Sequence, residues 1–300
     1  MSELLTVEAR GSSAREPAVE AGGSSAREPG VDKPAVLETR TWWQRSLATR
    51  RGLVVPGLVL VAWIVATHYG LVNKHLVAKP EKVVTRAIEE LRNGGLLLNL
   101  FASIKRDLIG FVIGAVAGVL FGGLLGVSRR SERLFGPTFH AAKQVAMFAW
   151  IPLMSVWLGT GEVAKVVFIA VAAFYPIVVN TQEGIESVAR EHIEVARAFR
   201  YTRWQIVRKV VFPSALPSIF AGVQTGLIYA WLGTIGAEYL LSPDLGIGNL
   251  MIEGRESLQM DKVLLGVTVV GLVGASINLL ASRLEQYVLR WRVTAFEARQ

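Results

Sequence analysis

Long apolar stretches alternate with short polar ones along most of this chain. Six of the apolar stretches are long enough to cross about 30 Å of hydrocarbon at a rise of about 1.5 Å per residue. We predict membrane-spanning helices near residues 53–71, 106–127, 139–159, 163–181, 214–240 and 262–282. Lys143 and Gln144 interrupt the third stretch, and only "GTGE" separates it from the fourth. The pattern therefore predicts an all-α integral membrane protein with six transmembrane helices.

The second predicted span carries a glycine at every fourth position, which puts these glycines on one face of a helix. Small residues on one face let a neighbouring backbone approach closely, and helices associate in lipid in this way. We therefore predict a helix-packing seam, with a flexible hinge as the alternative. The glycines are Gly110, Gly114, Gly118, Gly122 and Gly126.

Composition and charge agree with a membrane protein. Of 300 residues, 52% are hydrophobic and only 19% are charged, and the mean hydropathy is +0.41. If the N-terminus is cytoplasmic, cytoplasmic segments hold 21 of the 32 Lys and Arg residues and external segments hold seven. This bias predicts that both termini are cytoplasmic. The basic residues that give the net charge of +8 are expected to face anionic membrane lipid. Nucleic-acid binding is not predicted, because the sequence has no basic patch interleaved with aromatic residues.

The ends of the chain differ from its apolar body. Residues 1–40 are rich in Ser, Ala, Gly, Pro and mixed charges, with "GSSAREP" occurring twice, and we predict a disordered tail. Residues 41–52 contain Trp42, Trp43, Arg50 and Arg51, which suit an interfacial anchor. Residues 53–292 are predicted to form one transmembrane domain, followed by a short C-terminal tail at 293–300.

The longest polar segment between two spans is "EVARAFRYTRWQIVRKVVFPSALP", residues 194–217. Apolar residues fall at helical spacing before Arg200 and Tyr201 and again after them. Thr202 stands three residues before Gln205, which is typical of a capping box at a helix start, and Pro213 is expected to end that helix. We predict two short amphipathic helices joined by a tight turn at the cytoplasmic surface. Taken alone, they fit either a helix pair lying on the membrane or a docking surface for another protein.

This segment resembles the "EAA" loop of ABC importer permeases. Glu194-x-Ala196, a turn, and Val210-x-Phe212-Pro213 have the spacing of that loop, which reads E-A-A, three residues, Gly, nine residues, Ile-x-Leu-Pro. Blocks at 151–181 and 229–251 and the ending "LEQYVLRW" also look like the branch that imports aliphatic sulfonates, taurine, nitrate or bicarbonate. The resemblance covers about residues 76–292.

The resemblance implies a type I ABC importer permease fold with cytoplasmic coupling helices at 184–213, in a bacterial cytoplasmic (inner) membrane. It implies a homodimer of permeases, two copies of a separate ATPase subunit that bind ATP and Mg, and an external substrate-binding protein. This chain has no Walker phosphate loop, so we expect a non-catalytic subunit that binds no cofactor. Its implied coupling residues are Glu194, Ala196, Arg200, Tyr201, Thr202, Trp204, Val210 and Pro213.

The substrate implied by the resemblance is a small oxyanion, with an aliphatic sulfonate or taurine as the first choice. Nitrate, bicarbonate or another small organic substrate is the alternative. Polar or large residues inside the predicted spans are candidates for the pathway. We name Met154, Asn180, Gln224, Trp231 and Glu238, and Glu238 also fits a paired carboxylate that holds the neighbouring loop. Lys165, beside a predicted external turn, is a candidate contact for the binding protein.

One position departs from the family pattern, because Arg200 stands where the loop has glycine. Glycine after a helix end adopts a left-handed conformation at no cost, whereas another residue loses roughly 1 kcal/mol. Either the turn differs here, or Arg200 accepts the strain and presents a charge to the ATPase.

No catalytic or metal site is predicted. The chain has no cysteine, its histidines lack metal-ligand spacing, and no Ser/His/Asp arrangement stands out. These features disfavour a membrane enzyme. A secondary transporter is the remote alternative, but it would need an intramembrane carboxylate or histidine relay and usually repeated spans, and we find neither.

Overall fold

The computed structural model describes residues 54, 57–70, 77–241 and 244–289. The predicted tails at 1–40 and 293–300 and the anchor at 41–52 lie outside these residues. The chain divides into two compact units, Met1–Pro56 and Gly57–Gln300, and all helices discussed below belong to the second. The predicted all-α fold is confirmed, since the described residues contain helices and no strand.

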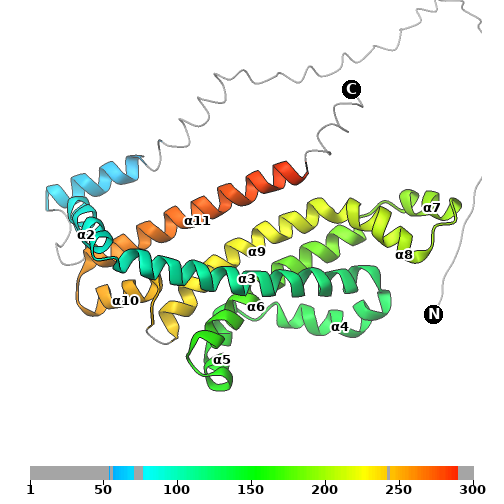
Figure 1. Ribbon diagram of the computed structural model, residues 1–300, viewed down its shortest axis with the longest axis horizontal. Helices are drawn as coiled ribbons and strands as arrows, with labels where there is room; N and C mark the ends of the chain where they lie inside the picture. The colour runs from blue at the N-terminus through cyan, green and yellow to red at the C-terminus, as the bar shows by residue number, and fades with distance from the viewer. Residues whose placement is uncertain (1–53, 55–56, 71–76, 242–243, 290–300) are drawn as a thin grey trace, which may run out of the picture. The chain divides into compact units, whose positions relative to one another are not determined.

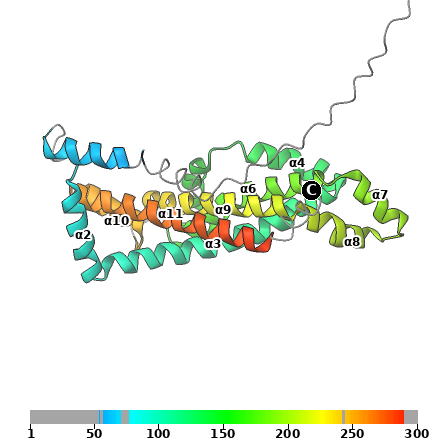
Figure 2. The same cartoon turned by 90° about the horizontal axis from the view of Figure 1, so that it is seen from above.

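An apolar helix at Gly57–His68 comes first among these helices. It is followed by α2 (Pro80–Arg92), α3 (Gly95–Val127), α4 (Arg129–Ala142), η1 (Met147–Trp150), α5 (Ile151–Leu158), α6 (Glu162–Glu186), α7 (Arg190–Ala198), α8 (Arg203–Ile206), η2 (Val207–Val211), α9 (Phe212–Leu240), α10 (Ile247–Glu256) and α11 (Met260–Val288). Figures 1 and 2 show α3, α6, α9 and α11 running along one long axis. In both views α7 and α8 lie at one end of these helices, and α2 and α10 lie at the other.

The number of spans differs from the prediction. In the described residues, four helices are long and apolar enough to cross a membrane: α3, α6, the continuous helix Arg203–Leu240, and α11. The straight span predicted at 139–159 is wrong, because α4 and the helix at Met147–Leu158 meet at a bend of 95°. They make a fifth span only if this broken pair crosses together. The first predicted span appears as the short helix Gly57–His68, so the count of six is not confirmed.

Two helix boundaries also differ. The second predicted span begins at Gly95 rather than at residue 106, so charged residues near 105 lie within the helix. Pro213 does not end a helix, because α8, the π-helical turn η2 and α9 are continuous. Proline has no N–H to donate, and the wider π turn immediately before it accommodates the missing hydrogen bond.

Glycines make the packing of α3 on α6 possible. A Cβ atom added at Gly110 would lie 2.6 Å from the Ile169 side chain, and one at Gly118 would lie 2.9 Å from Ile177. Real Cβ atoms do not approach neighbours this closely, so only glycine lets the two helices pack at their observed separation. α9 meets α6 in the same way, since a Cβ at Gly226 would lie 2.6 Å from Ile177. α6 is therefore the central helix, in contact with both α3 and α9.

Candidate functional site

The polar segment after α6 folds as a helix pair, α7 and α8, at one end of the long helices (Figure 1). The predicted capping box is confirmed at the start of α8. The Thr202 hydroxyl accepts a hydrogen bond from the Gln205 N–H at 3.3 Å, and the Gln205 side-chain oxygen accepts one from the Thr202 N–H at 2.8 Å. Because α8 continues into α9, the helix pair is joined directly to a membrane span.

The turn between α7 and α8 is a Schellman motif with Arg200 in the left-handed conformation, at φ 56°. The Arg200 N–H donates to the Arg197 carbonyl at 2.8 Å, and the Tyr201 N–H donates to the Ala196 carbonyl at 3.1 Å. These two bonds define the motif that usually places glycine at this position. Of the two possibilities left open by the sequence, Arg200 therefore accepts the strain while the turn keeps its usual form.

The predicted coupling residues divide into exposed and packed groups. Ala196 is 5% exposed and belongs to an apolar cluster with Ile185, Ile206 and Ala215, which fixes α7 against α8 and α9. Val210 and Pro213 are half-buried. The exposed residues are Glu194, Arg200, Tyr201, Thr202 and Trp204.

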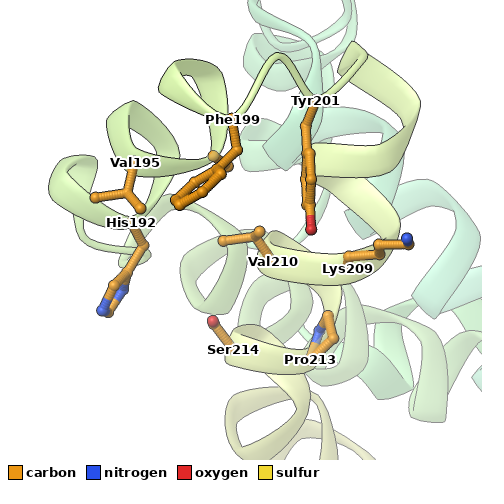
Figure 3. A pocket seen from close by; sticks show the side chains of 9 residues that line it. His192, Val195, Phe199, Tyr201, Lys209, Val210, Pro213 and Ser214 are labelled. Carbon is orange, nitrogen blue, oxygen red and sulfur yellow. The ribbon is translucent and has the colours of Figure 1, made fainter.

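A cleft of about 420 Å³ opens between α7 with the turn after it and the segment formed by η2 and the start of α9. Figure 3 shows the rings of Phe199 and Tyr201 over this cleft with Val210 between them. The Lys209 ammonium lies 5.5 Å from the centroid of the Tyr201 ring, which is within cation–π range. Phe199 is 74% exposed and Trp204 is 70% exposed. Large apolar side chains displayed on a charged surface fit a site for another protein, and they also fit a helix pair that lies on the membrane.

The cationic side chains of the α7–α8 helix pair are available to a partner. Six Lys and Arg residues lie between 190 and 209. In the part of the chain that the structure describes, every ion pair lies at the opposite end of the long helices, and none involves these cations. The helix pair is thus a cationic surface with exposed aromatic side chains.

A second polar site, which we call the Arg106 cluster, consists of Ser103, Arg106, Glu162 and Glu238. The Glu238 carboxylate is 1% exposed and accepts hydrogen bonds from the Ser103 hydroxyl at 2.7 Å and the Gly248 N–H at 2.9 Å. The Arg106 guanidinium pairs with Glu238 and also with Glu162, where Nε lies 2.8 Å from Oε2. The cluster ties α3, α6 and α9 to the start of α10. Glu238 therefore holds the loop before α10, as one of its two interpretations predicted.

Lys165 lies close to this cluster and is also buried. Its side chain is 1% exposed, and its ammonium donates to the Asp244 carboxylate at 3.0 Å. The prediction that Lys165 reaches a binding protein is therefore wrong, because the buried ammonium is already paired with a carboxylate of the loop before α10.

Three of the five pathway candidates are buried between helices of this chain. Met154 is 7% exposed and packs with Phe168 and Ala237. Trp231 is 4% exposed, and its indole N–H donates to the Val270 carbonyl at 3.1 Å, joining α9 to α11. Glu238 belongs to the Arg106 cluster. These three side chains hold helices together and do not face an open path within the chain.

The other two pathway candidates are only half-buried. The Asn180 amide donates to the Pro176 carbonyl at 2.8 Å, and the Gln224 amide donates to the Ser282 hydroxyl at 2.9 Å. Lining of a pathway by Asn180 and Gln224 stays a prediction.

The sequence reasoning did not find Ser103, Arg106, Asp107 or Phe199. The first three lie outside or at the margin of the span predicted to begin at residue 106, although the apolar run extends back to residue 95. A charged triplet inside such a run is itself a signal of buried pairing. Asp107 is 4% exposed and accepts a hydrogen bond from the Thr234 hydroxyl at 2.9 Å.

Comparison with known proteins identifies the relatives of this chain. Residues 110–293 match the family described as "Binding-protein-dependent transport system inner membrane component". The "Putative aliphatic sulfonates transport permease protein SsuC" of Bacillus subtilis (strain 168) is 34% identical over 242 residues, which are 81% of this chain and 87% of that protein. The "Bicarbonate transport system permease protein CmpB" of Synechococcus elongatus is 32% identical over 204 residues, 67% of this chain and 73% of that protein.

The fold has a counterpart among solved structures. A chain of the MetNI methionine ABC transporter in an inward-facing conformation matches with a TM-score of 0.55 and 22% sequence identity. The match covers 66% of this chain and 98% of that one. At this identity the likeness concerns the fold alone.

Proposed function

Because the chain belongs to the family of binding-protein-dependent transport system inner membrane components, whose members are ABC importer permeases, we propose that its α7–α8 helix pair is the docking site of a separate ATPase subunit. The single observation that carries this proposal is the exposed, cationic and aromatic surface around Phe199. Because α7 packs on α8 and α9 through Ala196 and α8 is continuous with α9, the pair can pass a displacement of the ATPase directly to a membrane span.

The assembly that we propose has two copies of this chain, two ATPase subunits and an external substrate-binding protein. ATP and Mg belong to the ATPase subunits, and this chain supplies no catalytic group. Both termini and the α7–α8 helix pair lie on the cytoplasmic side of the inner membrane, which agrees with the bias of Lys and Arg along the sequence.

We propose an aliphatic sulfonate or taurine as the substrate. The sulfonate permease relatives of Bacillus subtilis and Escherichia coli support this assignment, while the bicarbonate relative supports a small inorganic anion as the second candidate. Uptake by the complete transporter in proteoliposomes tests the choice, with radiolabelled taurine as the probe and nitrate and bicarbonate as competitors. No uptake of labelled taurine by a transporter that takes up labelled nitrate or bicarbonate would overturn the sulfonate assignment.

Removing the Glu194 carboxylate is expected to weaken ATPase association about tenfold. The carboxylate is exposed on α7, so a charge-assisted hydrogen bond to the ATPase is the interaction that Glu194→Ala would remove. The measurement is the amount of ATPase that co-purifies with the permease, together with substrate-dependent ATP hydrolysis. Glu191→Ala, on the same helix, is the matched control and should behave as wild type. Unchanged association and hydrolysis in Glu194→Ala would remove Glu194 from the docking surface.

Replacing Arg200 by glycine is expected to leave coupling intact and to stabilise the chain by up to about 1 kcal/mol. Glycine adopts the left-handed conformation of the α7–α8 turn without the strain that Arg200 carries. Thermal unfolding of the purified complex and its ATP hydrolysis rate give the two measurements. Loss of ATPase docking in this variant would show that the Arg200 guanidinium makes an essential contact.

A further inference from the structure

Leu258 is a second strained residue, and the proposed function does not use it. In the described part of the chain, Arg200 and Leu258 are the two residues other than glycine with a positive φ, and Leu258 has φ 54°. It lies in the turn between α10 and α11, which we call the α10–α11 turn (residues 257–259). A bulky residue in this conformation is a genuine outlier, and such outliers gather at functional sites.

The α10–α11 turn repeats the geometry of the Arg200 turn at the opposite end of the long helices (Figures 1 and 2). The Leu258 N–H donates to the Arg255 carbonyl at 3.2 Å, and the Gln259 N–H donates to the Gly254 carbonyl at 2.7 Å. These are the two bonds of a Schellman motif, in which glycine is the usual residue at the position that Leu258 occupies.

Folding does not account for leucine at this position. The side chain is 79% exposed, so it gains almost no burial in return for its strain. Arg255, Glu256 and Gln259 around it are also exposed, and such polar neighbours place the turn in water rather than in the hydrocarbon of the membrane. An apolar side chain held out into water by an unfavourable backbone conformation is suited to a contact with a partner.

The turn is held rigidly, as a contact point requires. The Lys262 ammonium, on the first turn of α11, pairs with Glu253 of α10 at 2.8 Å. A Cβ atom added at Gly254 would lie 3.0 Å from the Lys262 side chain and 3.1 Å from Val263, so α10 and α11 are in close contact beside the turn. The backbone that carries Leu258 is therefore held in place, and little backbone freedom remains to be lost on binding.

We propose that Leu258 inserts into an apolar pocket on the external substrate-binding protein. The inference rests on the proposed function: if the α7–α8 helix pair meets the ATPase in the cytoplasm, the α10–α11 turn at the other end of the long helices faces the external solution. The partner fitted to this surface is a water-soluble protein with an apolar pocket and a polar rim that complements Arg255 and Glu256.

The test compares Leu258→Gly with Leu258→Met in the complete transporter, reconstituted in nanodiscs with its ATPase and titrated with taurine-loaded binding protein. Leu258→Gly should weaken binding-protein association about tenfold, which corresponds to about 1.4 kcal/mol. Leu258→Met keeps a flexible apolar side chain and should bind as wild type. Basal ATP hydrolysis and ATPase co-purification should not change in either variant.

The melting temperature of the Leu258 variants distinguishes a role of Leu258 in recognition from a role in folding. Glycine relieves the strain in the turn, so the melting temperature of Leu258→Gly should equal or exceed that of wild type while its binding falls. Wild-type binding by Leu258→Gly would overturn the inference, as would a loss of permease dimerisation in place of binding-protein association. If the wild-type chain retains no ATPase, the proposed function fails, whatever the result at Leu258.

Discussion

Replacing Gly114 by leucine is expected to prevent α3 from packing on α6 and to destabilise the chain by about 3 kcal/mol or more. A Cβ atom at Gly114 would overlap the Ala170 carbonyl oxygen and would lie 2.9 Å from the Ala173 side chain. The carbonyl belongs to the helix backbone and cannot rotate away as a side chain can, so the helices must separate. The measurement is thermal unfolding of the detergent-solubilised protein, followed by the fraction that remains monodisperse.

The same helix provides the control for this substitution. Gly123 lies on α3 as well, but a Cβ atom there would meet nothing within 4 Å. Gly123→Leu should therefore unfold at the wild-type temperature or slightly above it, because leucine favours the helix more than glycine does. Equal stability of the Gly114 and Gly123 variants would contradict a packing role for the glycine seam.

Replacing Arg106 by glutamine is expected to cost about 3–5 kcal/mol, because it leaves the Glu238 carboxylate buried without its cation. Glu238 is 1% exposed and Arg106 is 4% exposed, so water does not substitute for the lost partner. Glu162, by contrast, is 58% exposed, and Glu162→Gln removes only a screened pair. That control should cost about 1 kcal/mol or less.

A double variant distinguishes loss of the Arg106–Glu238 ion pair from a general loss of packing around it. In Arg106→Gln with Glu238→Gln no buried unpaired charge remains, because Glu162 is exposed, so the combined change should be less destabilising than Arg106→Gln alone. The free energy of unfolding of all variants is compared in one detergent. A double variant at least as unstable as the sum of the two single variants would contradict the pairing of Arg106 with Glu238.

The sequence predicted a structural feature correctly where the spacing between residues has a single physical explanation. The four-residue period of the glycines on α3, the capping box at Thr202 and the break of local pattern at Arg200 each correspond to a feature of the structure. Local spacing was sufficient because the glycine period alone defines a smooth face on α3, while the capping box and the turn depend on neighbours a few residues away.

The sequence was less informative where the outcome depended on contacts between distant segments. Arg106 and Glu238 are 132 residues apart, and no local pattern shows that one neutralises the other. Pro213 was expected to stop a helix by local rules, but a π-helical turn allows the chain to continue into α9. The exposure of Phe199 and Leu258 likewise follows from the packing of the surrounding helices.

The docking of a separate ATPase on the α7–α8 helix pair is tested most directly by site-directed cross-linking. The chain has no cysteine, so a single substitution supplies its only thiol. Phe199→Cys in the assembled transporter, treated with a thiol-to-amine cross-linker, should form an adduct with the ATPase subunit. Leu258→Cys, at the opposite end of the long helices, should form none with that subunit. Absence of an ATPase adduct at Phe199, or equal adducts at both positions, would contradict the proposed docking site.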